Sequence, residues 1–274
     1  MNDQAISLFG LSEPQLRLGI FLVVFLVFSA LEALFPRRAR RAPRLHRWFT
    51  NLSMLMLATG LIRALAILAP LLAGVAAAGL SASLGFGLFH LIDAPAWLEI
   101  ALGVALLDLA IWGQHWATHN VPLLWRLHRV HHADLDLDAS SALRFHPVEM
   151  VLSAAYKLVI ILALGPAAIA VVIFEILLNA SAMFNHANLN LPLWLDRILR
   201  PIFVTPDMHR IHHSVNRAEH DRNYGFCLSI WDRMLGTYRA DPERGQIGMT
   251  LGLEPCQDKP TERLSWSLWF PFMR

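Results

Sequence analysis

Hydrophobic residues gather in four long stretches, and shorter segments rich in charge and histidine separate them. The stretches cover residues 18–35, 52–80, 97–116 and 151–179. A helix needs about 20 mainly apolar residues to cross the hydrocarbon core of a bilayer. The first three stretches meet this requirement, because polar residues interrupt them only sparsely. The pattern therefore predicts a protein that crosses a membrane several times.

The fourth stretch contains Gly165-Pro166, which divides it into pieces of 14 and 13 residues. Proline inside a helix clashes with the preceding turn, and a Gly-Pro pair favours a sharp bend. We therefore expect a helical hairpin that enters and leaves the membrane on one side. The alternative is a single kinked span, since transmembrane helices tolerate proline.

Basic residues predict the orientation. Residues 37–47 contain six arginines, whereas residues 64–125 contain no lysine or arginine. The positive-inside rule then places residues 36–50 in the cytoplasm and 81–96 outside. The third span returns the chain to the cytoplasmic side. Histidines before and after the fourth stretch can meet there only if that stretch folds back.

These observations predict an all-α integral membrane protein with three spanning helices, a re-entrant hairpin and a cytosolic helical cap. We expect an N-terminal membrane region at 1–96, a catalytic domain at 97–240 and an interfacial tail at 241–274. A bacterial inner membrane is the expected location. A net charge of +2 gives no indication of nucleic-acid binding, and the two cysteines cannot build a disulfide framework.

Histidine is the most informative residue type, because most of its 13 copies follow a repeated spacing. A His-x-x-x-His pair precedes a His-x-x-His-His box, Asn185-His186 follows, and a second such box lies about 80 residues after the first. Helix positions three or four apart share a face, while adjacent residues diverge by about 100°. Each doublet can thus point at two neighbouring metal ions, and nine imidazoles suit two ions with four or five ligands each. The expected ligands are His115, His119, His128, His131, His132, His186, His209, His212 and His213.

A purely structural role for this set is the alternative, although buried unpaired histidines are costly. Imidazole suits zinc, copper, iron and nickel, so the ligand type does not name the metal. His146 precedes Pro147 and is either a further ligand or a contact of a ligand or substrate. We expect His46 and His90 to be solvated, and His220 is a weaker candidate for supporting a ligand.

Acidic and amide side chains are candidates for hydrogen-bonding the ligating histidines, which usually donate their second N–H to such a partner. Asp108 is the strongest, because it lies seven residues before His115 on the same helical face inside the membrane. Asp207 and Asn223 are weaker candidates, since either can instead be a cap or turn residue.

Three further groups of residues have candidate roles. Glu175 and Asn179 share a helical face that can line a substrate path, and Glu149 can anchor the start of the hairpin. Arginines next to the histidine boxes can contact lipid headgroups or an acidic electron donor, although ordinary interfacial placement is the simpler interpretation. These arginines are Arg126, Arg129 and Arg210.

The ordered motifs resemble the sterol desaturase / fatty acid hydroxylase superfamily of membrane di-iron enzymes. Besides the histidines and Asp108, the resemblance rests on Leu-Trp-Arg-Leu-His at 124–128, Arg-Phe-His-Pro-Val-Glu at 144–149, Asn-His-Ala-Asn at 185–188, Thr205-Pro206, Asp-Arg-Asn-Tyr-Gly at 221–225 and Trp-Asp-Arg-Met-Leu-Gly-Thr at 231–237. It covers residues 97–240.

The resemblance implies two iron ions held by the nine histidines, O₂ as co-substrate and a lipid alkyl C–H bond as the target. Zinc can replace iron in purified protein, because zinc binds imidazole more tightly than Fe(II) does. The chain has no Gly-x-Gly-x-x-Gly fingerprint, so electrons are expected from a separate donor of ferredoxin or cytochrome type.

Two alternatives belong to other classes. A zinc-dependent membrane hydrolase is disfavoured, because His-Glu-x-x-His is absent and nine imidazoles exceed the three protein ligands of a catalytic zinc. A non-catalytic metal-binding protein or transporter predicts ligands spread over several spans. The sequence does not distinguish hydroxylation from desaturation, nor does it name the lipid.

Overall fold

The computed structural model describes residues 7–8, 10–70 and 73–273. These residues are mainly helical, and their one sheet is a short pair of strands, β1 (Ser7–Leu8) and β2 (Leu11–Ser12). Among the described residues, six helical segments are long and apolar enough to cross a membrane. They are α1 (Glu13–Leu34), α2 (Arg44–Leu68), α3 (Gly74–Leu84) with η2 (Leu88–Leu91), α4 (Ala96–Asn120), α6 (Pro147–Leu164) and α7 (Ala168–His186).

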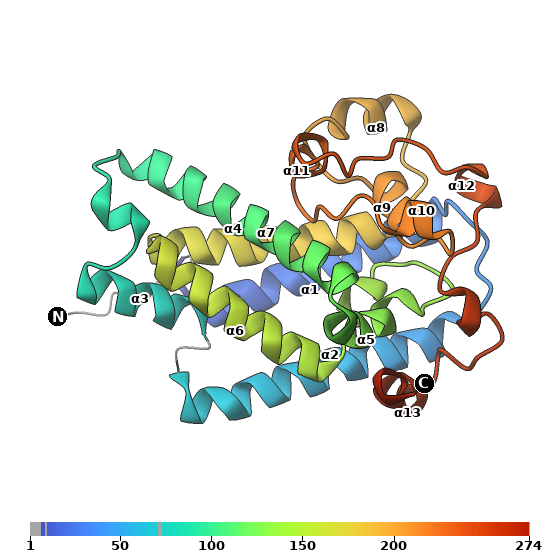
Figure 1. The fold of residues 1–274 in the computed structure, drawn as a ribbon, viewed down its shortest axis with the longest axis horizontal. Coiled ribbons are helices and arrows are strands. Elements are labelled where there is room, and N and C mark those ends of the chain that lie inside the picture. The colour runs from blue at the N-terminus through green and yellow to red at the C-terminus, as the bar shows by residue number, and fades with distance from the viewer. Residues whose placement is uncertain (1–6, 9, 71–72, 274) are drawn as a thin grey trace.

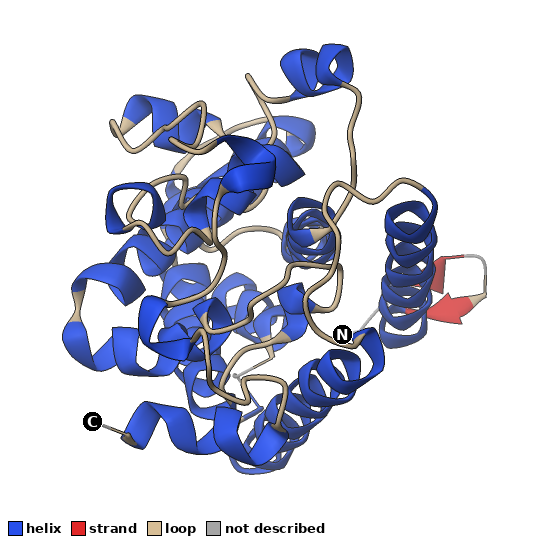
Figure 2. Cartoon of the chain, turned by 90° about the vertical axis from the view of Figure 1, so that its right-hand side faces the viewer, coloured by secondary structure: helices blue, strands red, loops and turns tan. Residues whose placement is uncertain are grey.

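The long helices form a bundle, and short elements cover one end of it (Figure 1). We call this covering layer the cap. It consists of α5 (Pro122–His132), η3 (Ser141–Leu143), α8 (Leu193–Leu199), α9 (Pro206–His212), α10 (Arg217–His220), α11 (Ile230–Met234), α12 (Gly245–Gly248), η4 (Glu254–Cys256), α13 (Leu264–Trp269) and η5 (Phe270–Phe272). Figure 2 looks onto this end, where short helices and loops overlie the ends of the long helices.

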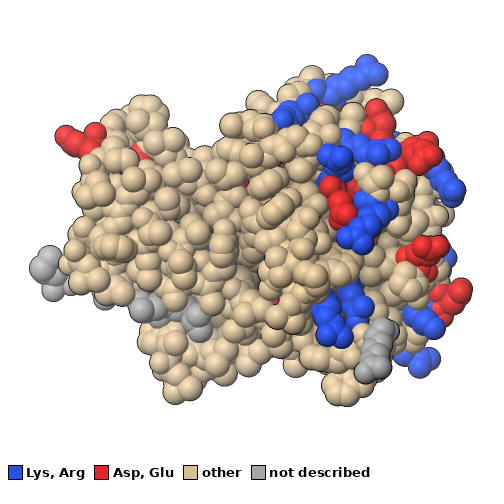
Figure 3. Space-filling model, viewed as in Figure 1, with Lys and Arg blue, Asp and Glu red and all other residues tan. Residues whose placement is uncertain are grey.

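Charge follows the same division. Lysine, arginine, aspartate and glutamate gather at the cap end of the face in Figure 3, and most of the bundle surface on that face lacks them. Large apolar side chains are exposed along the bundle instead, among them Leu26, Met56 and Ile67. A surface of this kind suits an aliphatic environment. The chain is therefore an integral, multi-pass membrane protein.

The second apolar stretch differs from the expectation. Residues 52–80 were expected to form one span, but the structure divides them between α2, which ends at Leu68, and α3, which begins at Gly74. Pro70 supplies the physical reason, because a proline disfavours the α conformation of the residue before it and cannot donate a backbone hydrogen bond. Ala69 accordingly leaves the helix with φ −136°.

The fourth stretch reverses direction, as expected. Helix α6 ends at Gly165, which has φ +63°, and α7 returns to the cap end. This reversal favours the hairpin over the single kinked span, and the membrane topology of the hairpin remains a prediction. The two arms are also longer than the sequence indicated, at 18 and 19 residues, because α6 begins at Pro147 and α7 continues to His186. At the tip, a Cβ on Gly165 would lie 2.7 Å from the carbonyl oxygen of Phe86.

The arginine-rich loop lies against the cap. Arg37 forms an ion pair with Asp207 at 2.8 Å, and the fully buried Arg47 contacts Asp134 at 2.8 Å and Asp138 at 2.5 Å. The arginines and the histidine boxes thus occupy the same end of the molecule.

Candidate metal centre

Four elements deliver the nine histidines of the repeated motifs to one place. They come from the end of α4, from α5, from the last residue of α7 and from α9 with its C-cap. All nine are buried, with at most 6% of any residue exposed. The structure therefore brings together the whole set that the spacing singled out, and its ligand role remains a prediction.

The histidines form two groups, and within each group the candidate ligand nitrogens lie within 4.8 Å of one another. The first group contains His115, His119, His128, His132 and His212, and the second contains His131, His186, His209 and His213. Both histidine doublets are split between the groups, as the angle between adjacent helical positions predicts. Each group consequently contains members of both boxes.

Hydrogen bonds orient several of the rings. Nδ1 of His115 lies 2.7 Å from the carbonyl oxygen of Tyr224, and Nδ1 of His212 lies 2.7 Å from that of Arg222. Nδ1 of His186 makes the same contact with Ala182. A carbonyl oxygen only accepts hydrogen bonds, so Nδ1 carries the proton in each ring. In the neutral form, Nε2 therefore has a free lone pair.

These lone pairs face one another. The Nε2 atoms of His115 and His212 are 3.0 Å apart, although neither carries a hydrogen in this tautomer. In the second group, Nε2 of His186 lies 3.1 Å from Nε2 of both His131 and His209. Two nitrogens held by one ion at about 2.1 Å and at a right angle would be about 3 Å apart. The donor set therefore fits a metal ion in each group.

Burial keeps the imidazoles neutral, which metal binding requires. It lowers the pKa of His128 to about 3. It also lowers the pKa of His131, His132 and His213, and neighbouring imidazoles lower those values further. Neither ring nitrogen of His213 has a hydrogen-bond partner among the described residues. Such a buried group is costly without a ligand.

Glu149 supports the first group in a way that the sequence did not predict. Its Oε1 accepts a hydrogen bond from Nδ1 of His128 at 2.7 Å, so Nε2 of His128 is turned toward the ligand set. Glu149 was expected to anchor the start of the hairpin, and its place in the first turn of α6 is consistent with that. The sequence signal was an acid directly after His146-Pro147, but only the fold shows which histidine it contacts.

The expected carboxylate and amide partners contact nearby backbone groups and other side chains instead of the histidines. Asp108 accepts hydrogen bonds from the backbone N–H of Cys227 and Leu228 and from the indole N–H of Trp231. Asp207 pairs with Arg37 and Arg210. The Asn223 amide donates to the carbonyls of Met208 and Arg239. In all three cases the sequence identified a buried polar residue near the site but not its partner.

The histidines outside the motifs differ from one another. His146 lies outside both groups, and as the N-cap of α6 its Nδ1 accepts from the backbone N–H of Val148. His220, rated a weak candidate, packs against the site, with its ring 4.4 Å from that of His132. His46 and His90 are exposed, as expected.

The arginines next to the boxes are also distinct from one another. Arg210 is fully buried against Asp207, so it contacts neither lipid nor a partner protein. Arg129 donates to the carbonyls of Phe270 and Met273 in the C-terminal tail. Arg126 is the exposed member.

A cavity of about 140 Å³ reaches the first group of histidines. His115, His128 and Glu149 line its inner end, and apolar side chains from α2, α4, α6 and α7 line most of the rest. Thr59 and Asn179 also line it and are exposed on the bundle surface. The cavity therefore connects the histidines with the apolar flank of the molecule.

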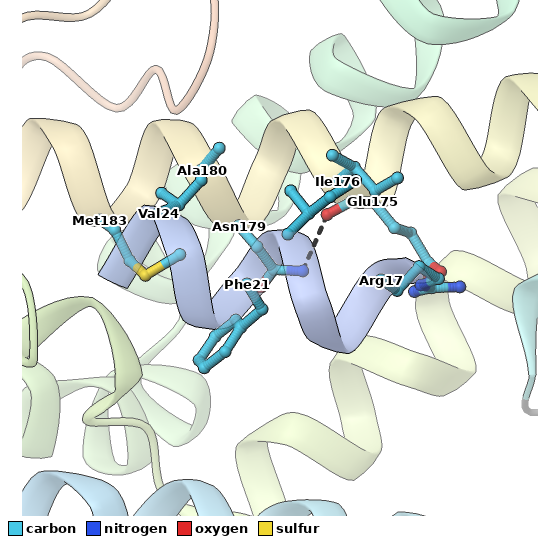
Figure 4. Close-up of a pocket in the computed structure, with 9 residues that line it drawn as sticks. Arg17, Phe21, Val24, Glu175, Ile176, Asn179, Ala180 and Met183 are labelled. Carbon is cyan, nitrogen blue, oxygen red and sulfur yellow. Dashed lines mark hydrogen bonds and ion pairs between the residues drawn. The ribbon is translucent and has the colours of Figure 1, made fainter. Parts of the chain in front are cut away.

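Only one of the two residues expected on a substrate path lines this cavity. Asn179 does so, whereas Glu175 lies in a smaller hollow between α1 and α7. Figure 4 shows Arg17 reaching from α1 to Glu175, with Asn179 one turn further along α7. Lys157 also contacts Glu175, at 3.1 Å. Opposite charges thus neutralise this carboxylate inside the bundle.

Comparison with known proteins identifies the family. The family model for fatty acid hydroxylases matches residues 100–237, which is half of the chain. The chain belongs to the fatty acid hydroxylase family. The matched segment contains all nine motif histidines, and it confirms the superfamily resemblance read from the motifs.

The curated relatives are lipid oxygenases by name. Alkylglycerol monooxygenase of Homo sapiens is 30% identical over 58% of this chain and 34% of its own length. Ornithine lipid hydroxylase of Rhizobium tropici is 30% identical over 57% of this chain and 47% of its own length. Cholesterol 25-hydroxylase of Rattus norvegicus is 23% identical over 58% of this chain and 52% of its own length. The match thus spans about a third to a half of each relative. No solved structure matches the chain at a significant level.

Proposed function

We propose that the protein is a membrane-bound di-iron oxygenase that hydroxylates an alkyl C–H bond of a lipid. The observation that carries this proposal is the position of the first histidine group at the inner end of an apolar cavity. Nine neutral imidazoles in two adjoining groups suit a pair of ions, and the cavity suits an alkyl chain.

Iron bound in both groups would supply O₂ reduction and removal of hydrogen from an unactivated C–H bond. The chain's own residues provide orientation and a dry environment. Glu149 and the carbonyl oxygens of Tyr224 and Arg222 hold the protons on Nδ1 of three ligands, so that Nε2 faces inward. The apolar lining excludes water and admits a chain from the bundle flank between Thr59 and Asn179.

The names of the relatives favour hydroxylation over desaturation, because each is called a hydroxylase or a monooxygenase. Their substrates by name are an ether lipid, an ornithine lipid and a sterol, so we assign this chain only a lipid. We further propose a separate electron donor of ferredoxin or cytochrome type, and a cytoplasmic location of the cap at a bacterial inner membrane.

Comparative lipid mass spectrometry tests the proposal. Cells with and without the protein are compared, with His131→Ala as the inactive variant and His46→Ala as its exposed control. A lipid heavier by one oxygen should require the intact protein and should persist in His46→Ala. The purified protein should hold about two irons per chain and consume O₂ when it is reduced.

Other outcomes would contradict the proposal. One zinc per chain without O₂ consumption, together with a lipid hydrolysed by the protein, would indicate a hydrolase. A lipid product lighter by two hydrogens would be consistent with the di-iron site but would show that the reaction is desaturation rather than hydroxylation.

A further inference from the structure

The cavity beside His115 and His128 distinguishes between kinds of lipid. Among the described residues that line it there is no lysine or arginine, and the one carboxylate, Glu149, already accepts a hydrogen bond from His128. A carboxylate or phosphate group that entered would lose its hydration without gaining a cation. Anionic head groups therefore have no counter-charge inside this cavity.

Two neutral polar side chains in the cavity form a pair. The Ser153 hydroxyl on α6 donates to Oε1 of Gln114 on α4 at 3.2 Å. The Nε2 hydrogens of Gln114 have no acceptor among the described residues, and both side chains line the cavity. The Ser153 oxygen also retains lone pairs that can accept. A ligand hydroxyl can therefore accept from Gln114 and donate to Ser153, which a hydrocarbon chain cannot do.

The pair lies close to the histidines. Gln114 directly precedes His115, and Ser153 follows Glu149 by four residues on α6. At 1.5 Å per residue this spacing corresponds to about 6 Å along the helix. A hydroxyl bound by the pair would thus lie only a few carbon atoms from a C–H bond at the inner end of the cavity.

We propose that Gln114 and Ser153 bind a hydroxyl group of the substrate, and so select neutral, hydroxyl-bearing lipids that are oxidised a few carbons from that oxygen. This inference rests on the proposed function, because it names the substrate class of the same site. Gln114 and Ser153 act as specificity residues and have no part in holding the metals.

Binding can be measured without turnover in zinc-loaded protein. The probes are 1-hexadecanol, hexadecane and palmitate at equal mole fraction in detergent, and the readout is the shift in unfolding temperature. The alcohol should stabilise the wild type more than the other two probes do. Gln114→Leu should bind the alcohol about fivefold more weakly, as the loss of one neutral hydrogen bond implies, with hexadecane binding unchanged.

Two further variants control for folding. Ser153→Ala removes only the acceptor and should weaken alcohol binding by a smaller factor. Leu152→Ala changes the adjacent residue, which is exposed on the bundle surface and does not line the cavity, and it should behave as the wild type. Equal stabilisation of the wild type by alcohol and alkane, or unchanged alcohol binding in Gln114→Leu, would overturn the inference.

An activity measurement separates this inference from the proposed function. If the iron-loaded wild type oxidises a lipid, Gln114→Leu should raise KM and spread the oxidised positions along the chain, with kcat within about twofold. Unchanged KM and positions would overturn the inference alone. If the wild type binds the alcohol preferentially but oxidises no lipid, the proposed function is wrong. Gln114 and Ser153 would then bind a hydroxyl group that does not belong to a substrate.

Discussion

At the scale of single residues, the candidate metal centre depends on what each imidazole does with its second nitrogen. His128 is oriented by a carboxylate from another helix, whereas His115 and His212 are oriented by backbone carbonyls. Only the first kind of partner can be removed by a substitution. A substitution at Glu149 can therefore test directly how the hydrogen-bond partner of a ligand histidine affects the candidate metal centre.

Replacing Glu149 by Gln should lower metal affinity and activity together. A glutamine oxygen can still accept from Nδ1, but a glutamine cannot take up the negative charge with which a carboxylate would increase the basicity of a metal-bound His128. Loss of such a partner typically costs about 10- to 100-fold in metal affinity or activity. Metal content after dialysis against a chelator, measured beside turnover, is the check.

Asp221→Asn is the matched control for this substitution. Asp221 also faces a ligand histidine, but it lies 3.4 Å from Nδ1 of His119 and its side chain is 36% exposed. Its replacement should have a clearly smaller effect. Equal losses in the two variants would show that orientation of His128 is not what Glu149 contributes.

The buried histidines also predict how the metal-free protein responds to pH. Burial lowers the pKa of His128 to about 3 and that of His220 to about 4, below the ordinary value of 6.5. As the pH falls below 6.5, the unfolded chain therefore binds protons that the folded chain does not. This contribution to stability is present in full above pH 6.5 and is lost progressively toward pH 4 and below.

Thermal unfolding of the metal-free protein in detergent measures this effect. The unfolding temperature should fall steadily from pH 7 to pH 4. Because His46 is exposed, a His46→Gln variant should show the same profile. A flat profile over this range would mean that the histidines are not held neutral by burial.

At the scale of elements, the hairpin of α6 and α7 determines where the histidines lie. Gly165 reverses the chain with a positive φ, and its Cα sits against the loop that follows α3. The reversal returns His186 to the end of the molecule that carries α5 and α9. The tip therefore lies about one helix length from the histidine that its turn returns to the cap.

Gly165→Ala should destabilise the protein by at least about 1 kcal/mol, because a left-handed conformation costs an L-residue that much before any clash. The added Cβ would also lie 2.8 Å from Oγ of Ser81. Gly60→Ala is the control, since no atom of the described residues outside its own stretch of α2 lies within 4 Å of the corresponding Cβ. Unfolding temperatures in the same detergent compare the two. A Gly165→Ala protein as stable as Gly60→Ala would show that the turn does not need glycine.

The comparison of sequence with structure is also clearest at this scale. The Gly165-Pro166 reversal could be predicted, because both residues have strong local preferences. The break between α2 and α3 had a comparable signal at Pro70, but the continuous hydrophobicity around it concealed the boundary. The spacing identified eight of the nine histidines, and the Asn-His-Ala-Asn motif of the family resemblance added His186. The partners of Asp108, Asp207 and Asn223 were not, because they are backbone groups and arginines that only tertiary folding brings near.

At the scale of the whole molecule, charge and hydrophobicity divide the protein into an apolar bundle and a charged cap. Several of the arginines that set the expected orientation are bound to the cap, as Arg37 is to Asp207 and Arg47 is to Asp134. The loop and the histidines must therefore share one side of the membrane, whichever side that is. Helix α3, which contains position 83, lies at the opposite end of the bundle (Figure 1).

Cysteine labelling can measure this sidedness. Single cysteines are placed at the exposed positions Ser83 and Asp258, with Cys227 and Cys256 replaced by Ala. A maleimide that cannot cross membranes should label Ser83→Cys in intact cells, and Asp258→Cys only after permeabilisation. Labelling of both from the same side would contradict a bundle that crosses the bilayer, and the reverse pattern would place the cap outside the cytoplasm.

The division of the histidine doublets between two groups has a consequence for biosynthesis. Each group takes members from the box at 128–132 and from the box at 209–213, so neither group is complete until both have been translated. A chain still on the ribosome with only the first box exposed offers His115, His119, His128, His131 and His132, without the members that close either group. The full ligand set of both groups therefore requires the second box, and a chain that stops before residue 209 would keep four of the five histidines of the first group but only two of the four of the second.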